Sequence, residues 1–283
     1  MNFNEYFLYL FIYSVIGWIC EVIYSKIVHG NWTNRGFLSG PYCPIYGFGG
    51  LFIILLLSPF ISNPILIFLL SILITTTLEY ITSFLMEKIF NAKWWDYSNE
   101  FLNINGRVCL ATAIPFGILG VLVMYFIHPL TTKFIALIPN WIINYIVGGL
   151  ISLTLLDIVT TISTLFNLKD KLKEAKLLAE KISENGKDMA KNSEVIKQLE
   201  EVKNSIIEKT NIFHNRIIKA FPNLEFNKYA IQFSEIKAKV LNKKNIKIKK
   251  EKEKVKEKEN KNENENVNVK ESKIKNETKE KKE

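Results

Sequence analysis

Three acidic residues lie inside long apolar stretches of this sequence, where an ionised side chain is costly. Glu21, Glu79 and Asp157 each interrupt a run of about 20 mostly apolar residues. A carboxylate in such surroundings is usually paired with a cation, or it serves as a site for a proton, a cation or another ligand. The first chemistry to consider is therefore the binding of a cation or a proton within a membrane.

Polar residues recur around these acids at helical spacing. Three series place acids among small or hydroxyl-bearing residues: Ser14, Gly17, Glu21 and Ser25; Ser71, Thr75, Glu79, Ser83 and Glu87; and Thr154, Asp157, Thr161 and Thr164. Residues three or four apart share one face of a helix. A polar face in a membrane helix turns toward protein or water rather than lipid. We therefore expect the acids to face the interior of a helical bundle.

Two polar connections accompany the acids, at 34–49 (NRGFLSGPYCPIYGFG) and 93–110 (KWWDYSNEFLNINGRVCL), and each contains one arginine. Together with the acids they supply the candidate polar or ligand-binding residues: Glu21, Asn34, Arg35, Glu79, Glu87, Asp96, Asn105, Arg107 and Asp157. Two interpretations stay open. In one, the two arginines form ion pairs with Glu21 and Glu79 that only hold the helices together. In the other, the carboxylates line a path for a ligand or a proton.

Five hydrophobic segments must position these residues, because each is long enough to cross a bilayer as a helix: about 5–27, 41–61, 64–86, 108–128 and 141–163. We predict an all-α polytopic membrane protein whose transmembrane domain spans residues 1–165. The second segment begins with two prolines and three glycines within ten residues. It is either a broken, re-entrant helix that lines a mouth or a helix started by proline and packed through its glycines.

Basic residues set the expected orientation. The connections after the first and third segments carry most of those that lie between segments: Lys26, Arg35, Lys88, Lys93 and Arg107. The connection after the second segment carries none. Because basic connections stay in the cytoplasm, we expect a multi-pass protein of the cell membrane with its N-terminus outside and its C-terminal tail inside. Each intramembrane acid would then lie on the order of 10 Å below the cytoplasmic surface.

The polar connection at 93–110 is also rich in aromatic residues. Trp94, Trp95, Tyr97 and Phe101 are expected at the level of the lipid headgroups, where aromatic side chains commonly anchor a segment. Stacking on a ligand is the alternative role.

The chain changes character after the fifth segment. Apolar residues at helical spacing predict a cytoplasmic helical, coiled-coil-like region over 166–241. Residues 242–283 contain 16 Lys and 10 Glu with no aromatic residue or Arg, which predicts a disordered tail. Alternating charges without aromatic residues do not favour nucleic-acid binding. A tail that approaches anionic lipid is the better interpretation.

Several common chemistries find no support. The sequence lacks a P-loop, an HExxH, a GxSxG and a dinucleotide fingerprint. The three histidines, at positions 29, 128 and 214, are expected at different faces of the protein, and the cysteines at 20, 43 and 109 lack metal-binding spacing. The sequence therefore predicts no cofactor, no metal and no catalytic residue, and it leaves enzymatic activity undecided.

Four blocks together resemble the type IV, or CmpB-like, family of ABC transporter permeases: GWICEV at 17–22, NRGFLSGPYCPIYGFG at 34–49, LEYITSFLMEKIF at 78–90 and WWDYSNEFLNINGRVCL at 94–110. The resemblance covers about residues 5–165. It implies a bacterial multi-pass membrane protein that acts as a transport component. Candidate partners are the lipid bilayer, an ATPase subunit or another membrane protein, and a second copy of the chain.

Two other functions remain in competition with transport. One is a membrane-embedded enzyme that acts on a lipid or lipid-linked substrate at the inner leaflet, with Glu79 or Asp96 as base and Arg107 on a phosphate. The other is a membrane scaffold or regulatory protein that works through the helices at 168–220.

Overall fold

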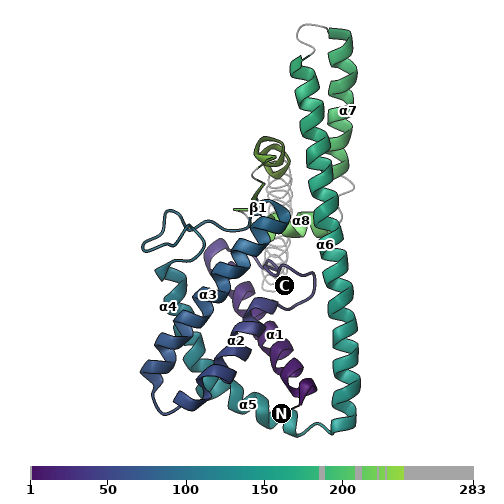
Figure 1. Ribbon diagram of the computed structural model, residues 1–283. Helices are drawn as coiled ribbons and strands as arrows, with labels where there is room; N and C mark the ends of the chain where they lie inside the picture. Colours follow the sequence, from purple (N-terminus) through teal and green to yellow (C-terminus); the bar gives the residue numbers. More distant parts are fainter. Residues whose placement is uncertain (1, 185–188, 208–211, 222, 227, 239–283) are drawn as a thin grey trace, which may run out of the picture. The chain divides into compact units, whose positions relative to one another are not determined.

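Long apolar helices make up most of this computed structural model, which describes residues 2–184, 189–207, 212–221, 223–226 and 228–238 (Figure 1). The helices are α1 (Phe3–His29), α2 (Pro44–Leu57), α3 (Pro64–Phe90), α4 (Leu110–Leu122), α5 (His128–Ala136), α6 (Asn140–Glu184), α7 (Met189–Ile207) and α8 (Ile212–Ala220). A 3-10 turn, η1, covers Ser58–Phe60, and a π-helical segment, η2, covers Val123–Ile127. Two short strands are β1 (Ala92–Lys93) and β2 (Glu225–Phe226). All these elements belong to the first of two units, which ends at Ile236.

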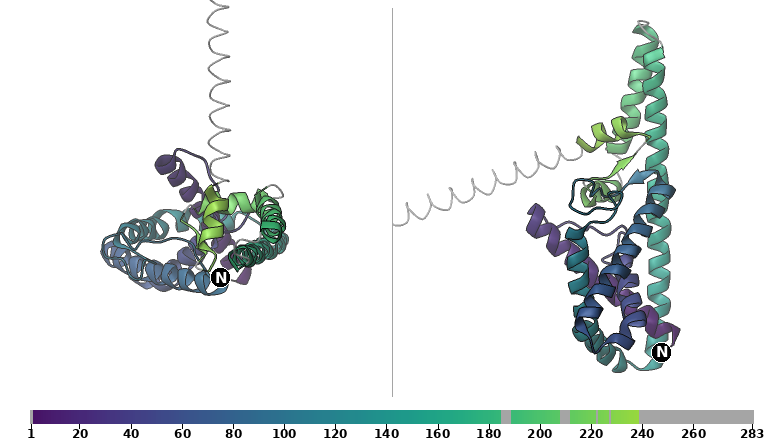
Figure 2. Two further views of the ribbon diagram at one scale, coloured as in Figure 1. Left: turned by 90° about the horizontal axis from the view of Figure 1, so that it is seen from above. Right: turned by 60° about the vertical axis from the view of Figure 1, so that its left-hand side comes forward.

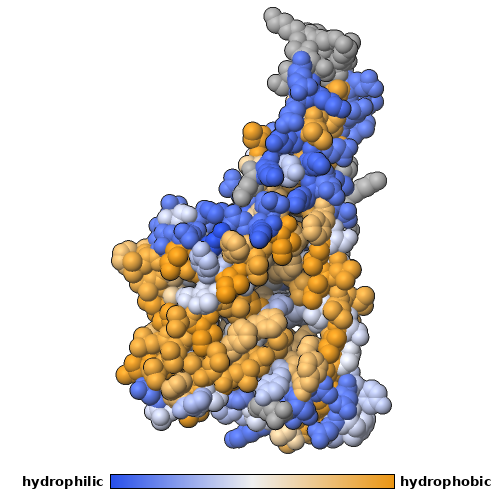
Figure 3. Space-filling view, in the orientation of Figure 1, coloured by the Kyte–Doolittle hydropathy of each residue, from blue (hydrophilic) through white to orange (hydrophobic). Residues whose placement is uncertain are grey.

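The predicted all-helical membrane fold is confirmed, although five spanning helices is an approximate count. In the described residues, four helices are long and apolar enough to cross a membrane: Phe3–Val28, Pro64–Phe90, Leu110–Ala136 and Asn140–Ile182. The second predicted segment forms only the shorter apolar helix Pro44–Phe60. Apolar side chains cover the face of the protein formed by these helices (Figure 3). Hydrophilic side chains cover most of the extension, by which we mean the described chain after residue 165 (Figure 3).

Prolines and caps account for the helix boundaries. Asn63 accepts a hydrogen bond from the amide of Leu66 (3.1 Å), and Pro64 occupies the first turn of α3, as expected at a helix N-terminus. Pro44 begins α2 three residues later than the sequence suggested, and the turn with Pro59 follows its end. Proline lacks the N–H that continues a helix, so the two prolines bound an apolar helix that is shorter than the other four.

Glycines bring α2 close to α1. A Cβ at Gly47 would overlap the hydroxyl of Ser14 and the carbonyl of Leu10, and one at Gly50 would press on the ring of Tyr13. Small residues permit such close approach between membrane helices. Of the two interpretations of this segment, the structure therefore shows the helix that starts at a proline and packs through its glycines.

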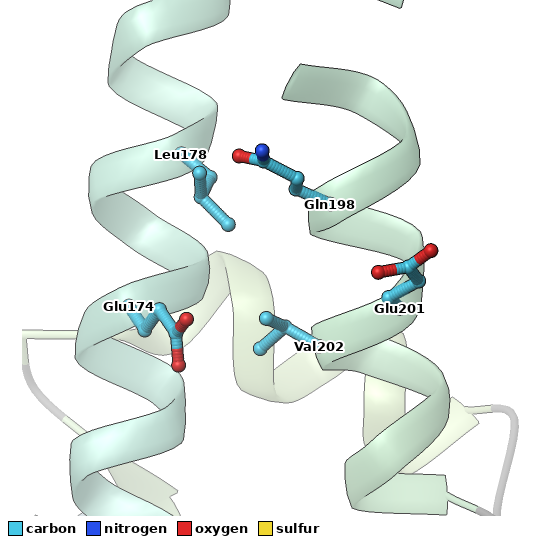
Figure 4. A pocket seen from close by; sticks show the side chains of 5 residues that line it. All are labelled: Glu174, Leu178, Gln198, Glu201 and Val202. Atoms are coloured by element: carbon cyan, nitrogen blue, oxygen red, sulfur yellow. The ribbon is translucent and has the colours of Figure 1, made fainter. Parts of the chain in front are cut away.

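The last spanning helix continues without a break into the extension. α6 runs through residue 165, and α7 packs back along it (Figure 2). The contact is made by apolar residues: Ala175, Leu178, Ala179, Ile182, Val195, Leu199 and Val202. Leu178 and Val202 point into the gap between the two helices, which Glu174, Gln198 and Glu201 also line (Figure 4). A helical hairpin thus occupies part of the predicted 166–241 region, and the predicted tail at 242–283 lies outside the described residues.

We predict that Gly47→Ala destabilises the protein because the added methyl group has no room between α1 and α2. Overpacking of this kind typically costs about 1–3 kcal/mol. The matched control is Gly49→Ala, since a Cβ there would meet its nearest neighbour, Leu78, at 3.7 Å, an ordinary contact. Thermal unfolding in detergent should show a lower midpoint for Gly47→Ala than for Gly49→Ala. Equal midpoints for the two variants would contradict the packing described.

Candidate functional site

The connection between α1 and α2, called the first connection from here on, is held to α6 by the carboxylate of Asp157. One oxygen, Oδ1, accepts hydrogen bonds from the amide of Ser39 (2.9 Å) and the hydroxyl of Thr161 (3.1 Å). The other, Oδ2, accepts from the amide of Gly40 (2.8 Å) and the hydroxyl of Tyr42 (2.7 Å). Four donors around one carboxylate stabilise its ionised form. Asp157 is therefore an anchor for this connection.

Asn34 shapes the same connection from within. Its side-chain oxygen accepts from the indole N–H of Trp18 (2.8 Å) and the amide of Gly36 (2.9 Å), and its side-chain amide donates to the carbonyl of Ser39 (3.0 Å). Asparagine commonly closes a turn in this way. Asn34 thus positions the backbone and the neighbouring arginine.

Arg35 and Glu21 form an ion pair, as one of the two open interpretations expected. The guanidinium Nε lies 3.2 Å from Oε2 of Glu21. The hydroxyl of Tyr46 donates to the other oxygen of Glu21 at 2.7 Å. The guanidinium carbon also lies 5.3 Å from the ring centre of Tyr24, within the range of a cation–π contact. Glu21 is thus partnered on both oxygens.

Arg107 pairs with Glu87 rather than with Glu79, the partner that one of the two open interpretations gave it. Its Nη2 lies 2.8 Å from Oε2 of Glu87, and its Nη1 donates to the hydroxyl of Ser83 at 3.3 Å. The guanidinium also lies 5.6 Å from the ring centre of Tyr80 and 5.5 Å from that of Phe84. The ion-pair partner of the arginine, Glu87, thus lies about two helical turns from Glu79.

The polar connection at 93–110, called the second connection from here on, positions Arg107 through its backbone. The carbonyl of Arg107 accepts from the indole N–H of Trp95 (2.9 Å). Asn105, which adopts the left-handed region with φ 54°, donates to the hydroxyl of Tyr80 at 2.8 Å. Gly106 follows with φ 66°, a conformation that glycine adopts without strain. Together these residues turn the chain so that Arg107 reaches α3.

Asp96 lies apart from the other candidates, on the surface of the second connection. Its carboxylate accepts from the amide and hydroxyl of Ser98 and contacts Lys93 at 3.0 Å. These hydrogen bonds lower the pKa of Asp96 to about 2. The residue closes a local turn.

Glu79 differs from the other intramembrane acids. It is 6% exposed, and its Oε2 has no hydrogen-bond donor in the part of the chain that the structure describes. The hydroxyls of Tyr97, from the second connection, and Thr112, from α4, approach the carboxyl group. Burial, followed by the charge of Glu79, raises the pKa of Tyr97. Glu79 is therefore a buried acid that polar groups reach but do not satisfy.

The three acids do not meet in one cluster. Glu21 and Asp157 each have their own set of donors, whereas Glu79 lies between α3 and α4. Glu21 is nevertheless close enough to Glu79 for the two negative charges to repel each other. Hydrogen bonds and ion pairs to Asp157 and Glu87 thus hold the two connections, whereas Glu79 keeps one oxygen without a donor among the described residues.

Arg216 on α8 is a residue of this region that sequence reasoning missed. Its Nη1 donates to the carbonyl of Gly36 (2.6 Å) and its Nη2 to that of Phe37 (2.8 Å). Burial lowers its pKa. A signal was available: the chain has three arginines among many lysines, and the other two are Arg35 and Arg107. Arginine is suited to donating several hydrogen bonds in a rigid geometry.

The extension also contacts the second connection. β2 pairs antiparallel with β1, which places Phe226 opposite Ala92. The ring of Phe221 packs edge-on against Trp94 at 4.9 Å, and Trp94 is only 3% exposed. The expectation that Trp94 anchors the connection in lipid is therefore wrong, because the side chain is enclosed by protein. Phe101, at 74% exposed, keeps the exposure that an anchor requires.

A family model described as "Putative ABC-transporter type IV" matches residues 8–162 of the chain. No curated protein and no solved structure matches it. The match confirms the resemblance drawn from the four sequence blocks, and it covers every candidate residue named above except Arg216.

We predict that Asp157→Asn loosens the connection at 34–43, since an amide offers one acceptor oxygen in place of two. Each hydrogen bond to a charged group contributes about 1.5–3 kcal/mol, so the amides of Ser39 and Gly40 should exchange with deuterium about tenfold faster or more. The control is Asp170→Asn, the same change at an exposed position of the same helix. Unchanged exchange in Asp157→Asn would show that the carboxylate does not anchor the connection.

Proposed function

We propose that this chain, which belongs to the family described as "Putative ABC-transporter type IV", is a membrane-embedded transport component whose polar site at Glu79 opens toward the cytoplasm. Four apolar helices of membrane-spanning length support the membrane location. The family description supports transport as the general role.

One observation carries the choice of Glu79: its buried carboxyl oxygen has no donor among the described residues. An unsatisfied buried polar group costs about 1–3 kcal/mol, and an acid within a membrane helix marks a functional site by default. The acids that hold the structure together, Glu21 and Asp157, are instead surrounded by donors. A buried acid that lacks a donor is best explained by a ligand that binds to it.

The basic residues of both connections support a cytoplasmic opening. Lys26 lies near the end of α1 and Arg35 in the connection after it, whereas Lys88 lies in the last turn of α3, and Lys93 and Arg107 lie in the connection after it. By the positive-inside rule these connections lie in the cytoplasm. Tyr97 and Arg107 would then cover the cytoplasmic side of Glu79, in the cell membrane.

The same geometry favours transport over a lipid-modifying enzyme. An enzyme of that kind would use Arg107 on a phosphate, yet this guanidinium is already engaged by Glu87 and Ser83. Arg35 is likewise engaged by Glu21. An ATPase subunit is the partner we propose for energy supply, in keeping with the family.

We predict that Glu79→Gln abolishes transport. The protein, purified from native membranes together with its associated subunits, would be reconstituted in liposomes and offered a ¹³C-labelled cell extract with ATP. Mass spectrometry of the lumen should reveal at least one solute that enters with the wild type and not into empty liposomes. We expect Glu79→Gln to lower its uptake at least tenfold, since the amide cannot carry the charge or proton of the acid.

The control variant is Glu100→Gln, which makes the same change at an exposed acid of the second connection. It should transport at the wild-type rate. Wild-type uptake in Glu79→Gln would assign this acid a structural role and remove the proposed site.

A further inference from the structure

We infer that the ligand of Glu79 is a proton, and that the polar face of α3 between Glu79 and Glu87 is its route from the second connection. The inference rests on the proposed function for its role in transport. The chemistry of the site itself, however, can be tested without any transported solute.

The donor set around Glu79 fits a proton better than a metal cation. Mg²⁺ and Ca²⁺ require about six to eight oxygen ligands. The groups that approach Glu79 are two neutral hydroxyls, those of Tyr97 and Thr112. Within the described residues, no group of three or more His, Cys, Asp or Glu side chains could hold a metal ion.

The charges that face Glu79 also favour its neutral form. From α1 comes Glu21, a like charge whose own partner is Arg35. From the second connection comes Tyr97, whose hydroxyl is neutral at physiological pH. On α3 itself lies Glu87, about two turns further along the helix, and its carboxylate is paired with Arg107 of the second connection. Among the described residues, no ion pair joins Glu79 to a basic side chain, so burial disfavours its carboxylate.

Protonation also lowers the cost of the unsatisfied oxygen, because a neutral carboxyl group is easier to bury than a carboxylate. A neutral carboxyl group has an O–H that can donate to the oxygen of Tyr97 or Thr112, and its carbonyl can accept from the other hydroxyl. In this step a proton passes from hydronium to the carboxylate. One O–H bond of hydronium breaks, the O–H bond of the acid forms, and a water molecule is left. Release reverses the transfer.

A line of polar groups joins Glu79 to the surface of the connection. Ser83 lies one turn along α3 and is 7% exposed, and its hydroxyl accepts from Arg107. Glu87 lies one turn further, and its side chain is 23% exposed. Successive members are about 6 Å apart along the helix axis, a distance that one or two water molecules can bridge. The face thus leads from a partly exposed ion pair to the buried acid.

Infrared difference spectroscopy of the full-length protein in liposomes tests the inference. The wild type at neutral pH should show the C=O stretch of a protonated carboxylic acid, and raising the pH should remove it. Glu79→Gln should lack this band, whereas Glu100→Gln should retain it. Glu79→Asp should show a shifted band, which guards against loss of folding as the cause of its disappearance.

The possible outcomes separate the inference from the proposed function. If the wild type lacks the band, or if Glu79→Gln retains it, Glu79 is not the proton site even where transport depends on this residue. If the band belongs to Glu79 but Glu79→Gln transports normally, the proton site stands and the proposed transport role of the residue fails.

Discussion

Each acid that lies among the apolar helices needs hydrogen-bond donors, and in this protein the donors come mainly from the connections between helices. Asp157 takes two backbone amides and the Tyr42 hydroxyl from the first connection. Glu87 takes its arginine from the second connection. Helix backbones cannot supply these donors, because their N–H groups are already bonded within the helix. The connections are therefore folded against the membrane helices, and this requirement determines where their arginines lie.

Apolar length was enough to predict an all-helical membrane fold, and polar spacing placed Glu79, Ser83 and Glu87 on one face of α3. They were not enough to predict partners. Glu79 and Glu87 lie on the same face of α3, so spacing alone allowed Arg107 to reach either. The turn at Asn105 and Gly106 selects Glu87. Such a choice depends on backbone angles that a sequence pattern does not reveal.

The contacts of the extension were also beyond the reach of sequence reasoning. β1 and β2 are two residues long and separated by more than a hundred residues, and a strand of that length leaves no periodic signal. Arg216 could be suspected only from the scarcity of arginine. Arg216 contacts the first connection and β2 contacts the second, so α8 and β2 support the candidate site. A truncation that removes α8 would therefore disturb that support.

The central claim is that Glu79 is reached from the cytoplasm beneath the two connections. The most direct measurement is the reaction of Glu79→Cys with a membrane-impermeant thiol reagent, in a protein whose three native cysteines, Cys20, Cys43 and Cys109, are replaced by serine. The account predicts modification in inside-out vesicles and none in right-side-out vesicles. Modification only from the external side, or protection from both sides, would contradict it.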